Sequence, residues 1–179
     1  RYLVERHFRE MTHAGAGLDY AQKQQLTELN QRLSVLTTTF EKNLLADTND
    51  LAVVFDDAAE LDGLTEGELS AAAQNATDRG LDGRYVVTLT LFTGHPYLSS
   101  RTQRESRRRI LDASTSRGRR GNEHDNRQTL NEIVRLRAER AALLGFDSHA
   151  AAVTSDETAG SPEAVETLRL ADTPVVVMK

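Results

Sequence analysis

The sequence predicts a mostly α fold of long antiparallel helices with one or two short β-strands. Leucine and phenylalanine recur at steps of three and four in the stretch after Asp19, and helix-start signals precede several other segments. Only two short runs have the composition of a strand. The aromatic content of 5% and the absence of Trp suit helices that pack through Leu and Ala.

Two helices are predicted in the first fifty residues. Residues 2–13 form a short helix that Gly15 and Gly17 end. Asp19 caps the second helix, with Gln22 three positions later in capping-box register. This helix, of about 28 residues, has the spacing of one buried face. The apolar stripe consists of Leu26, Leu29, Leu33, Leu36, Phe40 and Leu44.

Residues 51–55 predict a short strand, and residues 85–91 predict another. In the second run, Val87, Leu89 and Leu91 alternate with a wetter face. That wetter face consists of Val86, Thr88 and Thr90. Residues 93–96, Thr-Gly-His-Pro, break the strand.

A helix is predicted between these two strands. Thr65 and Glu68 form a capping box, and Leu64 with Leu69 can form the hydrophobic staple around it. Gly80 follows the helix in the position that favours a left-handed residue.

Three further segments complete the predicted fold. Ser99 or Ser100 caps a helix that runs to about residue 116, and residues 117–122 form a charged turn. Asp125 or Asn126 starts the next helix, which Gly145 ends. Its predicted inward face is Leu130, Ile133, Val134, Arg137, Ala141 and Leu144. Ser-Pro-Glu at 161–163 starts a last helix over roughly 162–171.

Bulk composition limits the classes of protein. A formal net charge of −5 and a pI near 5.6 disfavour a dedicated nucleic-acid binder and suit a cytoplasmic protein. No cysteine is present, so disulfides and thiolate metal sites are excluded. The longest apolar runs are far shorter than the roughly 20 residues of a membrane span. Because the chain starts at Arg1 rather than Met, we expect residues 1–179 to be one helical domain from a larger protein.

The histidines do not have the pattern of a zinc site. Zinc needs three or four ligands, commonly with two at i and i+4 on a helix. His7 and His13 are six residues apart, and His124 lies in a hydrophilic Glu-His-Asp loop. We expect no metal ligand and no catalytic residue in this chain, and the remaining histidines, His95 and His149, suggest none.

Arginine is concentrated between residues 101 and 120. Arg101, Arg104 and Arg108 are predicted to share one helical face, where they could bind phosphate or a peptide carboxylate. The simpler interpretation is a solvated face paired with Glu105 and Asp112. No aromatic residues interleave these arginines, which argues against nucleic-acid binding. The charged turn adds Arg117, Arg119 and Arg120.

Other catalytic patterns are weak or missing. The acid pairs Asp47/Asp50 and Asp56/Asp57 could be general acids or cation ligands, but exposed turn acids are the expected interpretation. The sequence contains no glycine-rich phosphate loop, no Gly-x-Ser-x-Gly and no His-Glu-x-x-His.

Several short runs, in order along the chain, resemble one known family. They are residues 1–6, 14–18, 29–44, 61–65, 84–89, 119–127, 136–146 and 161–165. Together they are similar to the N-terminal half of zinc metallopeptidases of the thimet oligopeptidase family. The nearest branch is bacterial peptidyl-dipeptidase and oligopeptidase A. The resemblance extends to about residue 171, and residues 172–179 do not continue it.

The resemblance implies a larger, almost entirely helical peptidase whose two halves enclose a narrow channel for short peptides. Its zinc, two histidines, glutamate base and further glutamate ligand belong to the C-terminal half, so none transfers to a position here. This chain is then a substrate-channel part that needs the catalytic half as partner and holds no cofactor itself. The substrate-contacting residues, and the choice between dipeptide release and internal cleavage, stay unknown.

Two other functions stay open. One is a stand-alone helical interaction module without catalysis, which should be monomeric or form one defined dimer. A severed half should instead expose a large apolar face and self-associate. The other is an arginine-mediated nucleic-acid binder, whose affinity would fall steeply with salt. We also hypothesise that Arg117, Arg119 and Arg120 guide peptide carboxylates in the intact enzyme.

Overall fold

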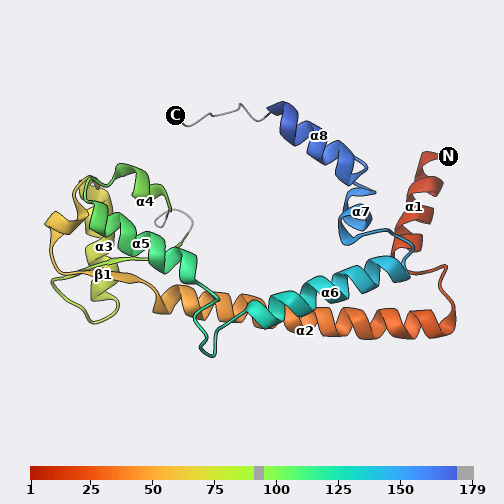
Figure 1. Cartoon of the computed structure of the whole chain (residues 1–179), viewed down its shortest axis with the longest axis horizontal. Helices are drawn as coiled ribbons and strands as arrows, with labels where there is room; N and C mark the ends of the chain where they lie inside the picture. Colours follow the sequence, from red (N-terminus) through yellow and green to blue (C-terminus); the bar gives the residue numbers. More distant parts are fainter. Residues whose placement is uncertain (91–94, 173–179) are drawn as a thin grey trace. The chain divides into compact units, whose positions relative to one another are not determined.

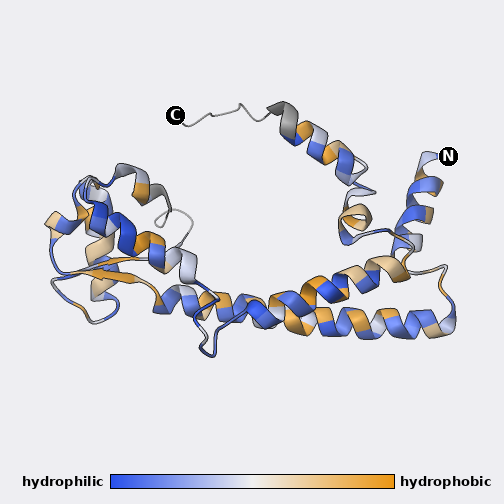
Figure 2. Ribbon diagram, viewed as in Figure 1, coloured by the Kyte–Doolittle hydropathy of each residue, from blue (hydrophilic) through white to orange (hydrophobic). Residues whose placement is uncertain are grey.

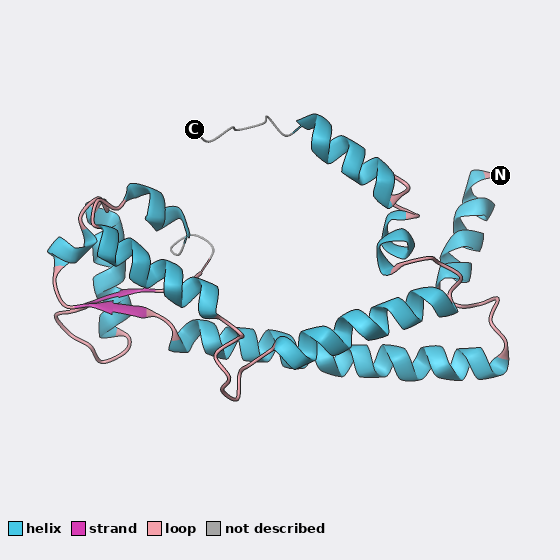
Figure 3. Cartoon of the chain, viewed as in Figure 1, coloured by secondary structure: helices cyan, strands magenta, loops and turns pink. Residues whose placement is uncertain are grey.

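A computed structural model of the chain describes residues 1–90 and 95–172. Helices joined by short loops make up most of the described residues, with one pair of strands (Figure 3). The elements in chain order are α1 (Tyr2–His13), α2 (Tyr20–Asp50), β1 (Val53–Phe55), the 3-10 helix η1 (Ala58–Leu61), α3 (Glu66–Thr77), β2 (Tyr85–Val87), α4 (His95–Ser100), α5 (Arg104–Ser116), α6 (Arg127–Leu143), α7 (His149–Thr154) and α8 (Pro162–Asp172).

The predicted mostly α class is confirmed. The chain divides into two compact units. The first unit contains Arg1–Thr37 and the described residues from Asn131 onward, and the second unit contains the described residues of Thr38–Leu130. None of the helices in the described part is both long enough and apolar enough to cross a membrane.

The start of α2 in the first unit follows the sequence signals. The Asp19 side chain accepts the Gln22 backbone N–H at 2.8 Å, and the Gln22 side chain accepts the Asp19 N–H at 3.0 Å. This reciprocal pair is the predicted capping box. Along the helix, Leu26, Leu29 and Leu36 are buried, so the predicted stripe faces inward.

Helices α2 and α6 pack side by side in the first unit and run in opposite directions (Figure 1). The Arg32 guanidinium donates to both carboxylate oxygens of Glu132, at 2.7 and 2.8 Å. Ile133 and Leu136 of α6 are buried as well. The predicted antiparallel pairing is therefore confirmed in this unit.

The predicted inward face of α6 is partly wrong. Ile133 and Ala141 are buried and Leu144 is half-buried, but Leu130 and Val134 are 48% and 59% exposed. Arg137 is exposed as well. Apolar residues occupy two adjacent faces of this helix, and periodicity alone does not say which of the two is covered.

The core of the second unit surrounds a two-stranded antiparallel sheet in which Val53 pairs with Val87 and Phe55 with Tyr85. Figure 2 shows hydrophobic residues gathered on these strands. Helix α3 packs against β2, and α5 packs against β1. Side chains exposed by 1% or less form the centre of the core: Phe55, Leu61, Val87 and Ile110.

The predicted second strand is shorter than expected and lacks a wetter face within its paired residues. Only Tyr85–Val87 pairs, and Leu91 lies outside the described residues. Val86, predicted to be on the wetter face, is 0% exposed. Neighbouring strand residues point to opposite faces, so burial of both Val86 and Val87 means that both faces of β2 are covered.

Local capping signals around α3 are confirmed. The Thr65 side chain accepts the Glu68 N–H, and Glu68 accepts the Thr65 N–H at 2.8 Å. Gly80 has φ +70°, and the Leu81 N–H reaches back to the carbonyl of Ala76 at 2.9 Å. This left-handed residue after the last turn has the predicted terminating role.

The single helix predicted from Ser99 or Ser100 to Ser116 is two helices, so the predicted serine cap is wrong. Helix α4 ends at Ser100, and α5 begins at Arg104 after Gln103, which makes no side-chain cap bond. Residues 101–103 instead bond to the segment around η1. The Thr102 N–H and hydroxyl donate to Asp62, and the Gln103 amide donates to the carbonyl of Ala59.

Gly63 makes this contact possible. It has φ +94°, and a Cβ at this position would lie 2.0 Å from the carbonyl oxygen of Ser100. Any side chain at residue 63 would therefore push the end of α4 away. The break between the two helices depends on contacts from residues 59–63, which a helix signal near residue 100 does not contain.

Helix α5 gives a matched pair of substitutions. Ile110 is fully buried, whereas its neighbour Leu111 is 44% exposed. We expect Ile110→Ala to lower the free energy of unfolding by about 2–5 kcal/mol, because it leaves a cavity in the core. Leu111→Ala should change it by less than about 1 kcal/mol. Urea denaturation of both variants measures the difference, and equal losses would contradict the assigned core.

Candidate functional site

The most extensive polar network in the described residues lies where residues 117–126 join α5 to α6. We call this segment the connecting loop. Gly118 and Gly121 have φ +68° and +71°, conformations that glycine adopts without strain. The sequence predicted a charged turn here, and the structure confirms it.

Asp47 of α2 holds the connecting loop in place. Its carboxylate accepts the Gly118 N–H at 2.6 Å and the Arg120 Nε–H at 2.7 Å, and it also accepts the Arg120 Nη2 group. The Asn122 amide lies 3.5 Å away. Because Asp47 is 0% exposed, its prediction as an exposed turn acid is wrong. It is a buried charge that is paired and hydrogen-bonded, which is the condition for burying one.

A signal for this role was present in the sequence. Asp47 follows Phe40 and Leu44 at helical spacing, so it continues the inward stripe of α2. A charged residue at an inward position needs a partner of opposite charge, and arginine is concentrated between residues 101 and 120. The spacing could therefore have identified Asp47 as the loop's anchor.

Asn126 closes the connecting loop from its other end. Its side chain donates to the carbonyl of Phe40 at 2.9 Å and accepts from the Asn43 amide at 3.1 Å. Its backbone N–H donates to the carbonyl of Gly118 at 2.8 Å. Asn126 is only 4% exposed, so the first turn of α6 starts from a fixed residue. Neither Asn43 nor Asn126 was predicted to have this role.

Two opposing effects set the pKa of Asp47. Burial disfavours the charged carboxylate and raises the pKa, whereas hydrogen bonds from Arg120, Gly118 and Asn122 lower it. The hydrogen bonds prevail, and the pKa is held below its usual value. Asp47 is therefore ionised at neutral pH, and it is better placed to anchor the loop than to transfer protons.

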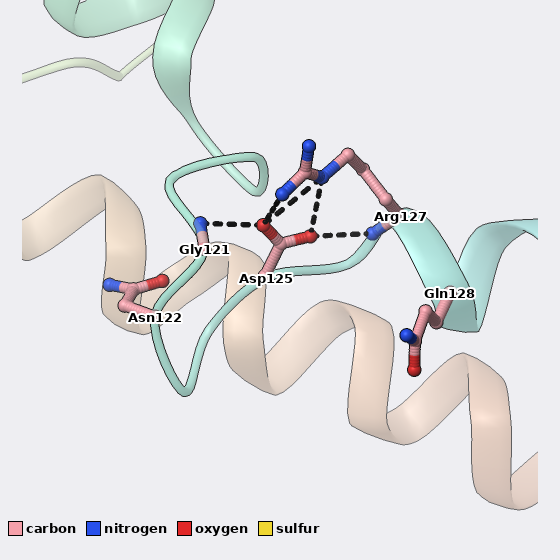
Figure 4. A pocket seen from close by; sticks show the side chains of 5 residues that line it. All are labelled: Gly121, Asn122, Asp125, Arg127 and Gln128. Atoms are coloured by element: carbon pink, nitrogen blue, oxygen red, sulfur yellow. Dashed lines mark hydrogen bonds and ion pairs between the residues drawn. The ribbon is translucent and has the colours of Figure 1, made fainter.

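A polar pocket of about 530 Å³ opens beside the connecting loop (Figure 4). Asp125 accepts from the Arg127 side chain at 2.7–3.1 Å, from the Arg127 N–H at 3.0 Å and from the Gly121 N–H at 2.6 Å. These contacts, led by the Arg127 side chain, hold the pKa of Asp125 well below its usual range. The pocket is lined by Gly121, Asn122, Asp125, Arg127 and Gln128.

This pocket can bind polar groups but lacks an evident proton donor. Asp125 stays charged at neutral pH, and its oxygens are already occupied by Arg127 and Gly121. The Gln128 amide remains available among the lining residues that the structure describes. The arrangement suits hydrogen bonding to a polar ligand better than acid–base chemistry.

The four histidines whose side chains the structure describes have different surroundings. His7 contacts Glu10 at 3.2 Å, and the His13 ring meets the edge of Phe146 with centroids 5.1 Å apart. His124 lies 3.8 Å from Asp50. Burial, followed by the charges of Arg137 and Arg140, lowers the pKa of His149. The side chain of His95 lies outside the described residues.

The side chains that the structure describes do not form a zinc site. Across residues 1–90 and 95–172, no group of three or more His, Cys, Asp or Glu side chains is arranged to hold a metal. A zinc site needs three or four such donors around one point. No step of a zinc-dependent reaction can therefore be derived from these side chains.

The arginines predicted to share one helical face are separated by the break before α5. Arg101 lies outside both helices and is 3% exposed, with its guanidinium 5.2 Å from the Phe55 ring centroid. Arg108 pairs with Glu105 at 2.8 Å and with Asp112 at 3.7 Å, as the simpler interpretation predicted.

The three arginines of the charged turn also have different surroundings. Arg117 donates to the carbonyls of Ser114 and Leu89, and Arg120 pairs with Asp47 and Asp50. Arg119 is exposed. Charge reversal at Arg117 or Arg120 would therefore disturb internal contacts, and Arg119 alone is suited to test whether this turn guides carboxylates.

Comparison with known proteins agrees with the resemblance in the sequence. Residues 97–172 match the sequence model of peptidase family M3. The chain is 35% identical over 162 residues to the dipeptidyl carboxypeptidase of Escherichia coli, covering 90% of this chain and 24% of that protein. It is 33% identical over 166 residues to the oligopeptidase A of Haemophilus influenzae, covering 90% and 24% respectively.

This chain belongs to peptidase family M3. The dipeptidyl carboxypeptidase of Salmonella typhimurium is also similar, at 34% identity over 84% of this chain and 22% of its own length. The family M3 chain thus spans about a quarter of the length of these curated relatives. The segment of the chain that matches the family model includes all of the connecting loop and its pocket.

The Asp47 anchor leads to a prediction for stability. Asp47→Asn keeps the shape of the side chain but removes the buried one of the two carboxylates that pair with Arg120, so we expect the free energy of unfolding to fall by about 3 kcal/mol or more. The control is Asp50→Asn, because the Asp50 side chain is 54% exposed and its pairing should contribute less than about 1 kcal/mol. Chemical denaturation measures both, and equal effects would contradict the anchor.

The pH dependence of stability provides a second test of Asp47→Asn. The pKa of Asp47 is lower in the folded chain, so ionised Asp47 stabilises the fold above its unfolded pKa of about 3.9. That contribution is lost as the pH falls through the folded value. The stability difference between the unmodified chain and Asp47→Asn should therefore stay constant near neutrality and shrink below pH about 4. Asp125 is present in both proteins, so its titration cancels.

Proposed function

We propose that this family M3 chain is the N-terminal, non-catalytic part of a zinc-dependent peptidase and forms part of the helical wall of its peptide channel. The zinc and the catalytic residues would belong to a C-terminal half, which is the chain's partner. The substrates of the whole enzyme would be short peptides. We also propose that the protein is cytoplasmic and that residues 1–179 function as one helical domain of the larger enzyme.

The observation that carries this proposal is the pattern of coverage. Similarity extends over 90% of this chain but only 24% of the E. coli dipeptidyl carboxypeptidase. The sequence has no His-Glu-x-x-His, the motif that places two zinc ligands and a base on one helix. A family M3 chain without this motif is more readily explained as a structural part of the enzyme than as the catalyst.

The names of the relatives support peptides as substrates. They are called dipeptidyl carboxypeptidase and oligopeptidase A. Both names describe hydrolysis of peptides, and they differ in where the peptide is cut. The proposal covers both modes of cleavage, because the residues that would decide between them are expected in the catalytic half.

The surface of α1 favours this proposal over a stand-alone interaction module. Val4, Phe8 and Met11 lie at helical spacing along one face, and they are 71%, 71% and 62% exposed. None of the residues of α1 is buried. Such a row of large apolar side chains is unusual on a protein that is complete as a monomer. It suits a segment that packs against further polypeptide, or that self-associates without it.

Peptidase activity tests the proposal. We expect the purified chain with stoichiometric zinc to release no dipeptide from an N-blocked short peptide and to retain no zinc after dialysis, because it lacks the ligand set. Mass spectrometry of the products and metal analysis measure the two outcomes. The oligopeptidase A of Escherichia coli, assayed in parallel, is the positive control. Zinc-dependent turnover by this chain would contradict the proposal.

A chimera tests the structural role directly. The 162-residue region of the E. coli dipeptidyl carboxypeptidase that matches this chain is replaced by the chain's own residues. If the chain forms the equivalent part, the chimera should cleave peptides, whereas a version that lacks the region should not. A folded but inactive chimera would count against an equivalent role in the channel wall.

A further inference from the structure

A second hollow, of about 360 Å³, lies between α4 and α5 in the second unit. Figure 1 shows these two helices next to each other, and they are in contact. Leu98 comes from α4, and the other lining residues come from α5. We call this the α4–α5 hollow, and the described residues that line it are Leu98, Arg104, Arg107, Arg108 and Leu111.

The α5 residues of the hollow share one face of the helix. Arg104, Arg107 and Leu111 follow one another at steps of three and four, the spacing of neighbours on a helix surface. The opposite face, with Ser106 and Ile110, is buried in the core. The core therefore fixes the rotation of α5 and turns the arginine face outward.

One wall of the hollow is apolar. Leu98 is half-buried and packs against the core of the second unit. Leu111 is 44% exposed, although it lies on an arginine-rich helix beside the buried Ile110. Two leucines lining one hollow offer an aliphatic group more contact than a single exposed leucine would.

The rest of the lining is cationic and only partly neutralised. Arg108 is balanced by Glu105 and Asp112. Arg107 donates through Nη1 to the carbonyls of Arg101 and Thr102, at 2.6 and 2.9 Å, and has no ion pair with an acid of the described residues. Arg104 is exposed and likewise has no ion pair with an acid among the described residues.

The charge pattern selects an anionic ligand. The chain as a whole has a net charge of −5, yet two uncompensated guanidinium groups line this hollow. The two carbonyl contacts also hold the Arg107 side chain in one orientation, so less entropy is lost when it binds a ligand. Guanidinium groups bind carboxylates in a defined planar geometry.

We propose that the α4–α5 hollow binds the C-terminal residue of a peptide. The terminal carboxylate contacts Arg104 and Arg107, and an aliphatic last side chain packs between Leu98 and Leu111. A terminal residue carries its carboxylate and its side chain on the same Cα, so both fit into a hollow of this size. No aromatic residue is among the described residues that line the hollow, so none of these side chains could stack on a nucleic-acid base.

The proposed binding site would let the chain recognise a peptide's C-terminal residue, and it does not depend on the proposed function. A peptide could bind here whether or not the chain walls the channel of a larger enzyme. The peptidase assay and the chimera can therefore fail while this site is correct, and the reverse also holds.

Fluorescence anisotropy on the purified chain tests the site with N-terminally labelled tetrapeptides. The first is Gly-Ser-Gly-Leu with a free carboxylate, and the second is the same peptide with a C-terminal amide. A third, Gly-Ser-Glu-Leu amide, carries its carboxylate on a side chain, and a fourth, Gly-Ser-Gly-Ser, lacks the aliphatic group. At low salt we expect the first peptide to bind about fivefold to tenfold more tightly than each of the others.

Two substitutions and a matched control assign the effect to the hollow. Arg104→Gln should remove the preference for the free acid over the amide, and Leu111→Ser should remove the preference for leucine over serine. The control is Arg79→Gln, because Arg79 is an exposed arginine elsewhere in the second unit. Circular-dichroism melting checks that each variant is folded. We do not expect Arg104→Gln to destabilise α5, because a positive charge in the first turn of a helix interacts unfavourably with the helix dipole.

Each other outcome would overturn the proposal. Absent binding, or equal binding of acid and amide, would mean that the hollow does not recognise a terminal carboxylate. Equal binding of the Glu-containing amide would assign the site to acidic side chains instead. An equal loss of affinity in Arg79→Gln and Arg104→Gln would show general attraction to a cationic surface.

Discussion

The second unit depends on one buried carboxylate. Asp47 lies near the end of a long helix, and its oxygens bond to the backbone of Gly118 and the side chain of Arg120. A buried carboxylate without these partners would be strongly destabilising, so the burial of Asp47 and the position of the connecting loop depend on each other. The position of the loop in turn fixes Asn126, where α6 starts, and the polar pocket around Asp125.

Sequence alone predicted the parts of the fold that depend on local signals. The Asp19–Gln22 and Thr65–Glu68 capping boxes, and the glycine stops at Gly80 and Gly145, need only neighbouring residues, and all are present. The break before α5, the burial of Val86 and the exposed side of α6 depend on residues distant in sequence. Within the site, the charged turn was predictable, and the inward spacing of Asp47 was a missed signal. The roles of Asn43 and Asn126 follow from tertiary geometry, which no local pattern encodes.

The arginine-rich stretch illustrates how identical residues acquire different roles. Arg101 is buried against Phe55, Arg108 is neutralised by its helical neighbours, and Arg120 stabilises a buried acid. Arg104 and Arg107 line a hollow together with Leu98 and Leu111, and neither has an ion pair with an acid among the described residues. Under the proposal above, the ligand of this hollow is the C-terminal residue of a peptide. Structural and recognition roles can therefore be separated within about twenty residues of sequence, and each can be tested without the other.

Hydrogen exchange at the connecting loop tests the dependence on Asp47 most directly. The backbone N–H groups of Gly118 and Asn126 lie in a loop, but each donates a hydrogen bond that the anchor holds in place. In the unmodified chain both amides should exchange about as slowly as amides in the middle of α2, and in Asp47→Asn both should exchange much faster while α2 stays protected. Fast exchange of both amides in the unmodified chain would contradict the central role of this carboxylate.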